Sequence, residues 1–104
     1  MSVLLEFSMF PLDQGDSLSA HVSQLIELIR ESGVDYRLTA MGTLVETEQI
    51  DTALALVARC NQLLQDRGCQ RIYAAIKVDY REGPVGRLQS KVESIQSKIG
   101  SVAQ

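Results

Sequence analysis

Residues Tyr36–Glu46 read YRLTAMGTLVE, and this stretch decides the fold. Tyr36–Met41 and Thr43–Glu46 each alternate like a β-strand, and Gly42 stands alone between them. A single glycine inside a strand pattern marks a tight turn, a bulge or a close approach by another group. We therefore predict a β-hairpin near the middle of the chain, with a hydroxyl and a carboxylate beside its turn.

Similar strand and helix patterns flank the hairpin on both sides. The elements expected before it are a strand over Ser2–Phe10, ended by Pro11, and a helix from an N-cap at Ser17 to about Ser32. Those expected after it are a helix from a cap at Thr47 to Gly68, a strand over Arg71–Arg81 and a helix over Gly86–Gly100. The order predicts an α+β chain with a ferredoxin-like βαββαβ fold. A four-stranded antiparallel sheet would carry two helices on one face, and the extra C-terminal helix would follow, all in one domain spanning residues 1–104.

The alternation also assigns residues to the two faces of the sheet. The sets expected under the helices are Val3/Leu5/Phe7, Tyr36/Leu38/Ala40 and Ile72/Ala74/Ile76/Val78. The opposite, open face would carry apolar and charged side chains together: Leu4, Glu6, Ser8, Phe10, Arg37, Thr39, Met41, Tyr73, Lys77 and Asp79. An exposed apolar patch of this kind indicates a surface that another molecule covers. We therefore predict a homo-oligomer.

Three charged residues, Lys77, Asp79 and Arg81, alternate on the open face of the last strand. An ion-pair network between subunits is the preferred interpretation, and contact with an anionic ligand is the alternative. Residues 71–98 hold six basic and three acidic side chains, although the whole chain has a net charge of −3. This mild local excess falls far short of a nucleic-acid-binding surface, and with aromatic residues at 5% and no Trp, base stacking is disfavoured as well.

Nothing in the sequence indicates catalysis, a metal site or a membrane segment. Cys60 and Cys69 lie nine residues apart, which is not a zinc-ligand spacing, and His21 is the only histidine. His21 is expected on the exposed first turns of its helix, and Cys60 in the core. The N-terminus has no basic segment and is interrupted by Glu6, so it does not read as a signal peptide. We expect a cytoplasmic, non-enzymatic protein without a cofactor.

Thr43 and Glu46 have two interpretations. Thr43 would satisfy the turn while Glu46 helps the next helix begin, or the two would hold a small ligand in a cleft whose apolar wall is Phe10 or Met41. The alternation places Glu46 on the same strand face as Leu44, unless a bulge at the glycine reverses the face. The residues alone leave the choice open.

The sequence resembles the small thiamine-binding protein family, the YkoF-like proteins. The pieces that carry the resemblance are FSMFPL at 7–12, SLSAHV at 17–22, YRLTAMGTLVE at 36–46, RIYAAIKVDYR at 71–81 and KVESI at 91–95. The resemblance implies ferredoxin-like subunits, assembled as a tetramer of single-domain chains (a dimer of dimers) or with two such domains fused in one chain. It also implies non-catalytic binding of thiamine or its hydroxymethylpyrimidine moiety, in transport, salvage or regulation. The loop LDQGDS at 12–17 departs from the family, which more often has Leu-Gly after the proline.

The resemblance assigns ligand-binding roles to residues around the hairpin. Glu46 would accept from the pyrimidine amine or hold a protonated ring nitrogen, and Thr43 would do either. Phe10 and Met41 would pack against the ring, and Glu6 or Phe10 would lie beside the thiazolium cation. Ser8 belongs to the same expected set. The alternative function is an oligomeric regulatory or interaction module with no small-molecule ligand.

Overall fold

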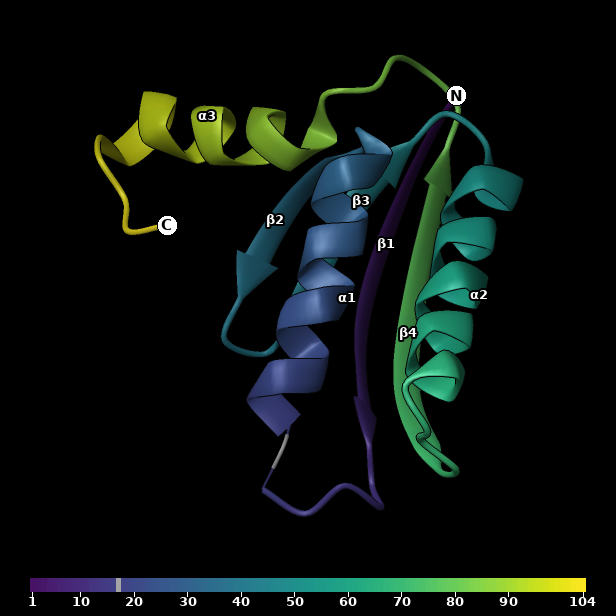
Figure 1. Cartoon of the computed structure of the whole chain (residues 1–104). Coiled ribbons are helices and arrows are strands. Elements are labelled where there is room, and N and C mark those ends of the chain that lie inside the picture. Colours follow the sequence, from purple (N-terminus) through teal and green to yellow (C-terminus); the bar gives the residue numbers. More distant parts are fainter. Residues whose placement is uncertain (17) are drawn as a thin grey trace.

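The computed structural model describes residues 1–16 and 18–104. Its elements are β1 (Ser2–Pro11), α1 (Leu18–Ser32), β2 (Asp35–Thr39), β3 (Gly42–Thr47), α2 (Ile50–Asp66), β4 (Ile72–Arg81) and α3 (Arg87–Ile99). The strands form one antiparallel sheet in the order β2-β3-β1-β4 (Figure 1). The predicted βαββαβ fold and the extra C-terminal helix are confirmed. The predicted N-cap at Ser17 lies outside the described residues.

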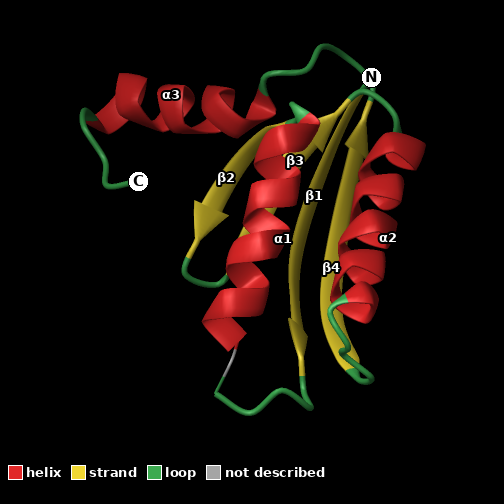
Figure 2. Cartoon of the chain, viewed as in Figure 1, coloured by secondary structure: helices red, strands yellow, loops and turns green. Residues whose placement is uncertain are grey.

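Helices α1 and α2 cover the same face of the sheet (Figure 2). The core between them is built from alternate residues of β1, from Val45 of β3, from one stripe of each helix and from Cys69 in the loop after α2: Val3, Leu5, Phe7, Met9, Leu25, Ile29, Val45, Ala53, Leu56, Val57, Cys60, Leu64 and Cys69. Both cysteines are buried free thiols, and burial raises the pKa of Cys60 to about 11. In the part of the chain that the structure describes, no helix is both long and apolar enough to span a bilayer.

The hairpin turn is tighter than the sequence predicted. Ala40 and Met41 form a two-residue turn and are not strand residues. The hydroxyl oxygen of Thr39 closes this turn by accepting the N–H groups of Met41 at 3.2 Å and Gly42 at 3.1 Å. Gly42 then begins β3, and a Cβ there would lie 3.0 Å from the carbonyl oxygen of Phe7. The glycine is therefore explained by close approach of a neighbouring strand.

Thr47 does not cap α2, contrary to the prediction. It is the last residue of β3, paired with Val3, and its hydroxyl donates to the carbonyl oxygen of Gln49 at 2.7 Å. Gln49 is the N-cap and makes no side-chain cap bond. Thr47 lies in β3, two residues before the N-cap, so its side chain is not at the capping position of α2.

The helices cover β4 less completely than the alternation predicted. Ile76 and Val78 lie on the helix side of the sheet, opposite Phe7 and Leu5, yet they are 44% and 41% exposed. β4 is one of the two edge strands of the sheet, and Tyr80 on the same side is also exposed. A ten-residue edge strand with apolar side chains is thus left open to a partner.

Candidate functional site

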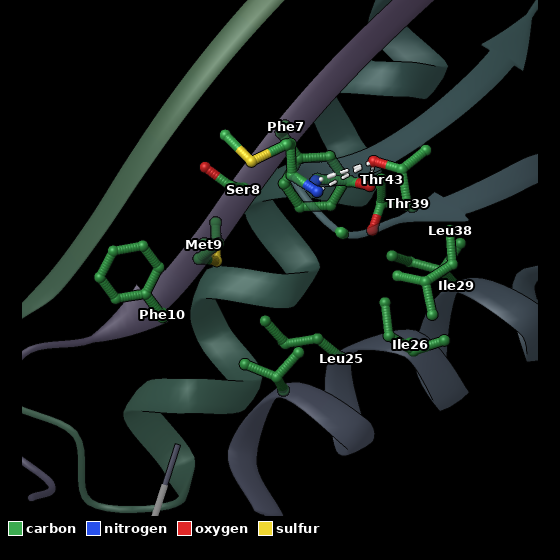
Figure 3. A pocket seen from close by; sticks show the side chains of 14 residues that line it. Phe7, Ser8, Met9, Phe10, Leu25, Ile26, Ile29, Leu38, Thr39 and Thr43 are labelled. Atoms are coloured by element: carbon green, nitrogen blue, oxygen red, sulfur yellow. Dashed lines mark hydrogen bonds between the residues drawn. The ribbon is translucent and has the colours of Figure 1, made fainter. Parts of the chain in front are cut away.

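A pocket of about 390 Å³ opens between α1, β1 and the hairpin turn. Its lining comes from three segments: Phe7, Ser8, Met9 and Phe10; Val22, Leu25, Ile26 and Ile29; and Leu38, Thr39, Ala40, Met41, Gly42 and Thr43. Figure 3 shows the labelled side chains around this cavity, with Leu25, Ile26 and Ile29 of α1 on one side of it. A mostly apolar concavity with few polar groups is the usual form of a small-ligand site.

The pocket forms where β1 and β3 part. Their pairing ends at Phe7 opposite Thr43, whereas β1 continues beside β4 as far as Pro11 opposite Ile72. The hairpin turn therefore leaves a gap beside the last part of β1, and α1 lies across it. The parting of the strands creates the cavity without any loop insertion.

Thr43 supplies the buried polar side chain of this pocket. Residue Thr43 is only 5% exposed, and its hydroxyl makes no hydrogen bond to any other described residue. Because every fully buried side-chain oxygen of the described residues has a hydrogen-bond partner, this hydroxyl must reach the pocket surface. The nearby Thr39 hydroxyl is already used, because it donates to the carbonyl oxygen of Gly42 at 2.8 Å and accepts two N–H groups of the turn. Thr43 is consequently available to a ligand, and Thr39 holds the pocket wall.

Four of the predicted ligand residues line the pocket: Ser8, Phe10, Met41 and Thr43. Met41 is 85% exposed at the turn. Ser8 and Phe10 stand opposite Ala75 and Tyr73, which places their side chains on the open face of the sheet. The Phe10 and Tyr73 rings are 5.5 Å apart between centroids, so Phe10 already has an aromatic neighbour.

Glu6 and Glu46 lie outside the pocket. Glu46 stands opposite Leu4 and Glu6 opposite Leu44, on the open face, whereas Thr43 stands opposite the core residue Phe7. No bulge reverses β3, so Thr43 and Glu46 lie on opposite faces of the sheet, and one pocket does not hold both. Glu6 instead has its carboxylate 3.6 Å from the ammonium group of Lys77.

The Glu46 carboxylate holds the N-terminus of α3. It accepts the N–H of Gly86 at 3.0 Å, of Arg87 at 3.2 Å and of Leu88 at 3.4 Å, together with the hydroxyl of Ser2. Burial by itself would raise the pKa of Glu46, but these hydrogen bonds outweigh it and hold the pKa below its ordinary value of 4.5. Glu46 is thus the capping carboxylate of a helix distant in sequence.

Arg87 completes this anchor of α3 from the other side. Its guanidinium donates to the hydroxyl of Ser2 at 2.9 Å, to the carbonyl oxygen of Ser2 at 2.9 Å and to that of Asp79 at 2.8 Å. It also lies 3.2 Å from the Asp79 carboxylate. Lys77 and Asp79 therefore have ion-pair partners within the chain, while Arg81 stands opposite Ser2 at the end of β4.

Sequence reasoning missed the contribution of α1 to the pocket, and it misplaced His21. His21 is buried at 6% exposure, contrary to the predicted surface position, and its Nδ1 accepts from Nε of Arg67 at 2.9 Å. The signal was present in the sequence, because residues 21, 25 and 29 are spaced four apart on one helical stripe. The same stripe holds Leu25 and Ile29, which line the pocket.

Comparisons with known proteins agree with this architecture. The chain is 32% identical over 98 residues to a UPF0045 protein of Methanothermobacter thermautotrophicus, covering 93% of this chain and 99% of the relative. A solved domain of unknown function from Bacillus cereus superimposes with a TM-score of 0.78 at 30% identity, covering 88% of each chain. A candidate thiamine biosynthesis or salvage protein from Thermotoga maritima shares the fold, with a TM-score of 0.77 at 20% identity and coverage of 91% and 99%. The family model described as thiamine-binding protein matches residues 5–96, and the chain therefore belongs to the thiamine-binding protein family.

Proposed function

We propose that this protein binds thiamine or its hydroxymethylpyrimidine moiety in the pocket between α1, β1 and the hairpin turn, and that it does so without catalysis. The observation that carries the proposal is the unpartnered hydroxyl of Thr43 at the surface of a mostly apolar cavity. Membership of the thiamine-binding family supports the choice of ligand. The biological role would be transport, salvage or regulation.

The pocket suits a flat heteroaromatic ring. Leu25, Ile26 and Ile29 offer an apolar surface to the ring face, and a hydroxyl both donates and accepts, so Thr43 suits either a ring nitrogen or an amine. Met41, which projects from the turn, would cover the bound ring.

The experiment is calorimetry of the protein with thiamine, hydroxymethylpyrimidine and thiamine phosphates. We expect Thr43→Val, which removes the hydroxyl and keeps the shape, to weaken binding about tenfold. Thr52→Val, at an exposed position of α2, is the matched control and should bind like the parent. Absence of binding to every one of these ligands by the parent protein would refute the proposal.

Self-association through β4 is the second part of the proposal. The observation that favours it is the open ten-residue edge, where Ile76, Val78 and Tyr80 are each more than 40% exposed. Two copies of β4 running antiparallel would satisfy each other's backbone groups and bury these side chains. If the pocket binds no ligand, this assembly would remain as the function of an interaction module.

A further inference from the structure

We propose that the backbone N–H and C=O of Met9 bind the amine edge of the ligand's pyrimidine, in addition to the bond that the Thr43 hydroxyl makes elsewhere on the ring. The N–H and C=O of Met9 would pair with a ring nitrogen and the adjacent exocyclic amine, in the way one strand pairs with another. The inference rests on the proposed function, because it concerns the same pocket, and it names what the ligand must carry.

The strand register shows which way the backbone groups of β1 point. In an antiparallel pair, successive residues direct their N–H and C=O to opposite sides. The N–H of Leu12, directly after β1, donates to the carbonyl oxygen of Arg71, the residue before β4, at 2.9 Å, so even-numbered residues of β1 face β4. The carbonyl oxygen of Phe7 lies against Gly42, so odd-numbered residues face β3.

Pro11 fits this assignment. Proline has no N–H, and within a sheet it is tolerated where that donor would have no strand partner. Pro11 is the last residue of β1, and β4 is the only strand beside it. As an odd-numbered residue, it directs its backbone groups away from β4, toward the side of β3. The N–H that proline lacks would therefore have pointed to the side where β3 has already ended, so no strand hydrogen bond is lost.

Met9 lies between Phe7, where β1 stops pairing with β3, and Pro11, and its backbone groups point the same way as theirs. It faces the side of β3 but lies beyond the end of the β1–β3 pairing at Phe7, and it lines the pocket. Among residues 1–16 and 18–104, no hydrogen bond to its N–H or C=O is formed on that side. Its side chain is directed into the core, so the peptide edge is what Met9 offers the cavity.

The chemistry of this edge selects a class of ligand. In an extended residue the N–H donor and the C=O acceptor lie side by side and point the same way. An aminopyrimidine carries the complementary pair, a ring nitrogen that accepts beside an amine that donates. A ring without the amine would leave the Met9 carbonyl unpaired in a dry pocket, which weakens binding.

The first arm of the test compares two ligands. Hydroxymethylpyrimidine and its counterpart lacking the 4-amino group are titrated into the protein by calorimetry. We expect the amine to strengthen binding about tenfold. Equal affinity of the two ligands would overturn the inference and leave the proposed function standing. No binding of either would also overturn the inference, and no binding of thiamine or its phosphates in addition would overturn the proposed function.

The second arm observes the peptide group directly. In the amide NMR spectrum of the ¹⁵N-labelled protein, saturation with hydroxymethylpyrimidine should shift the Met9 N–H and slow its exchange with solvent. The Ser8 N–H, which faces β4 opposite Ala75, is the internal control and should stay protected throughout. An unchanged Met9 N–H at full saturation would show that another group reads the ring.

Discussion

Glu46 is a buried carboxylate whose hydrogen-bond partners all come from its own chain. Ser2 and the first N–H groups of α3 surround it, and they lower its pKa despite burial. A carboxyl whose pKa is lowered on folding stabilises the folded state above its unfolded pKa. That contribution is lost as the pH falls below about 4.5 and through the folded pKa.

Replacing Glu46 by Gln should lower the free energy of unfolding at pH 7 by about 1–3 kcal/mol, because a neutral amide accepts these N–H groups less well. Urea denaturation measures the change. The loss of stability on acidification should also be smaller in the variant than in the parent. Glu48→Gln, at an exposed position, is the control and should stay within about 0.5 kcal/mol. Unchanged stability in Glu46→Gln would contradict the capping role.

The faces of the sheet on which Thr43 and Glu46 lie were predictable from their spacing along β3. Two residues an odd number apart on a regular strand lie on opposite faces. The alternation therefore already grouped Glu46 with Leu44, as the structure confirms. The partner of Glu46 was not predictable, because the N-terminus of α3 lies 40 residues away and alternation holds no information on which distant segment meets a face.

At the scale of elements, α3 is attached to the sheet at one end. It begins near the end of the sheet that holds the chain's N-terminus and extends outward past β3 and β2 (Figure 1). Ile95 and Ile99 on its apolar stripe are exposed, so the described residues bury little of the helix. The guanidinium of Arg87, only 10% exposed, therefore carries much of the attachment.

Arg87→Lys should loosen α3 and leave the rest of the sheet in place. A lysine keeps the charge but cannot reach Ser2 and Asp79 with a planar fork of donors, which costs about 1–3 kcal/mol. Amide hydrogen exchange should show faster exchange within residues 87–99 and unchanged exchange in β1. Arg81→Lys, at an exposed position of β4, is the matched control. Equal exchange in α3 of both variants would contradict this attachment.

The elements themselves were predictable from periodicity, and their junctions were not. Apolar alternation and helical stripes gave every strand and helix in the right order. The predictions of the hairpin turn and of the start of α2 were wrong, because both features depend on which backbone group a threonine hydroxyl bonds. Thr39 bonds within the turn and Thr47 bonds forward to Gln49, choices that residue type alone does not determine.

At the scale of the whole molecule, the open edge of β4 predicts self-association. Val78→Lys should disrupt pairing between two copies, because a charge would enter the buried edge. Light scattering after size-exclusion chromatography should give the parent a molar mass greater than that of one chain, and the variant a lower molar mass. Thr52→Lys adds the same charge on exposed α2 and should assemble like the parent. A parent that elutes as single chains would contradict the prediction.

The anchor of α3 also has a consequence for the order of folding. Its hydrogen bonds join residues 40, 44 and 85 positions apart, from Glu46 to Gly86, from Ser2 to Glu46 and from Ser2 to Arg87. The cap that α3 needs does not exist until β1 and β3 are side by side, and closing such long loops carries an entropic cost that earlier contacts must offset. α3 should therefore dock last on refolding and be the first element released when the native state opens locally.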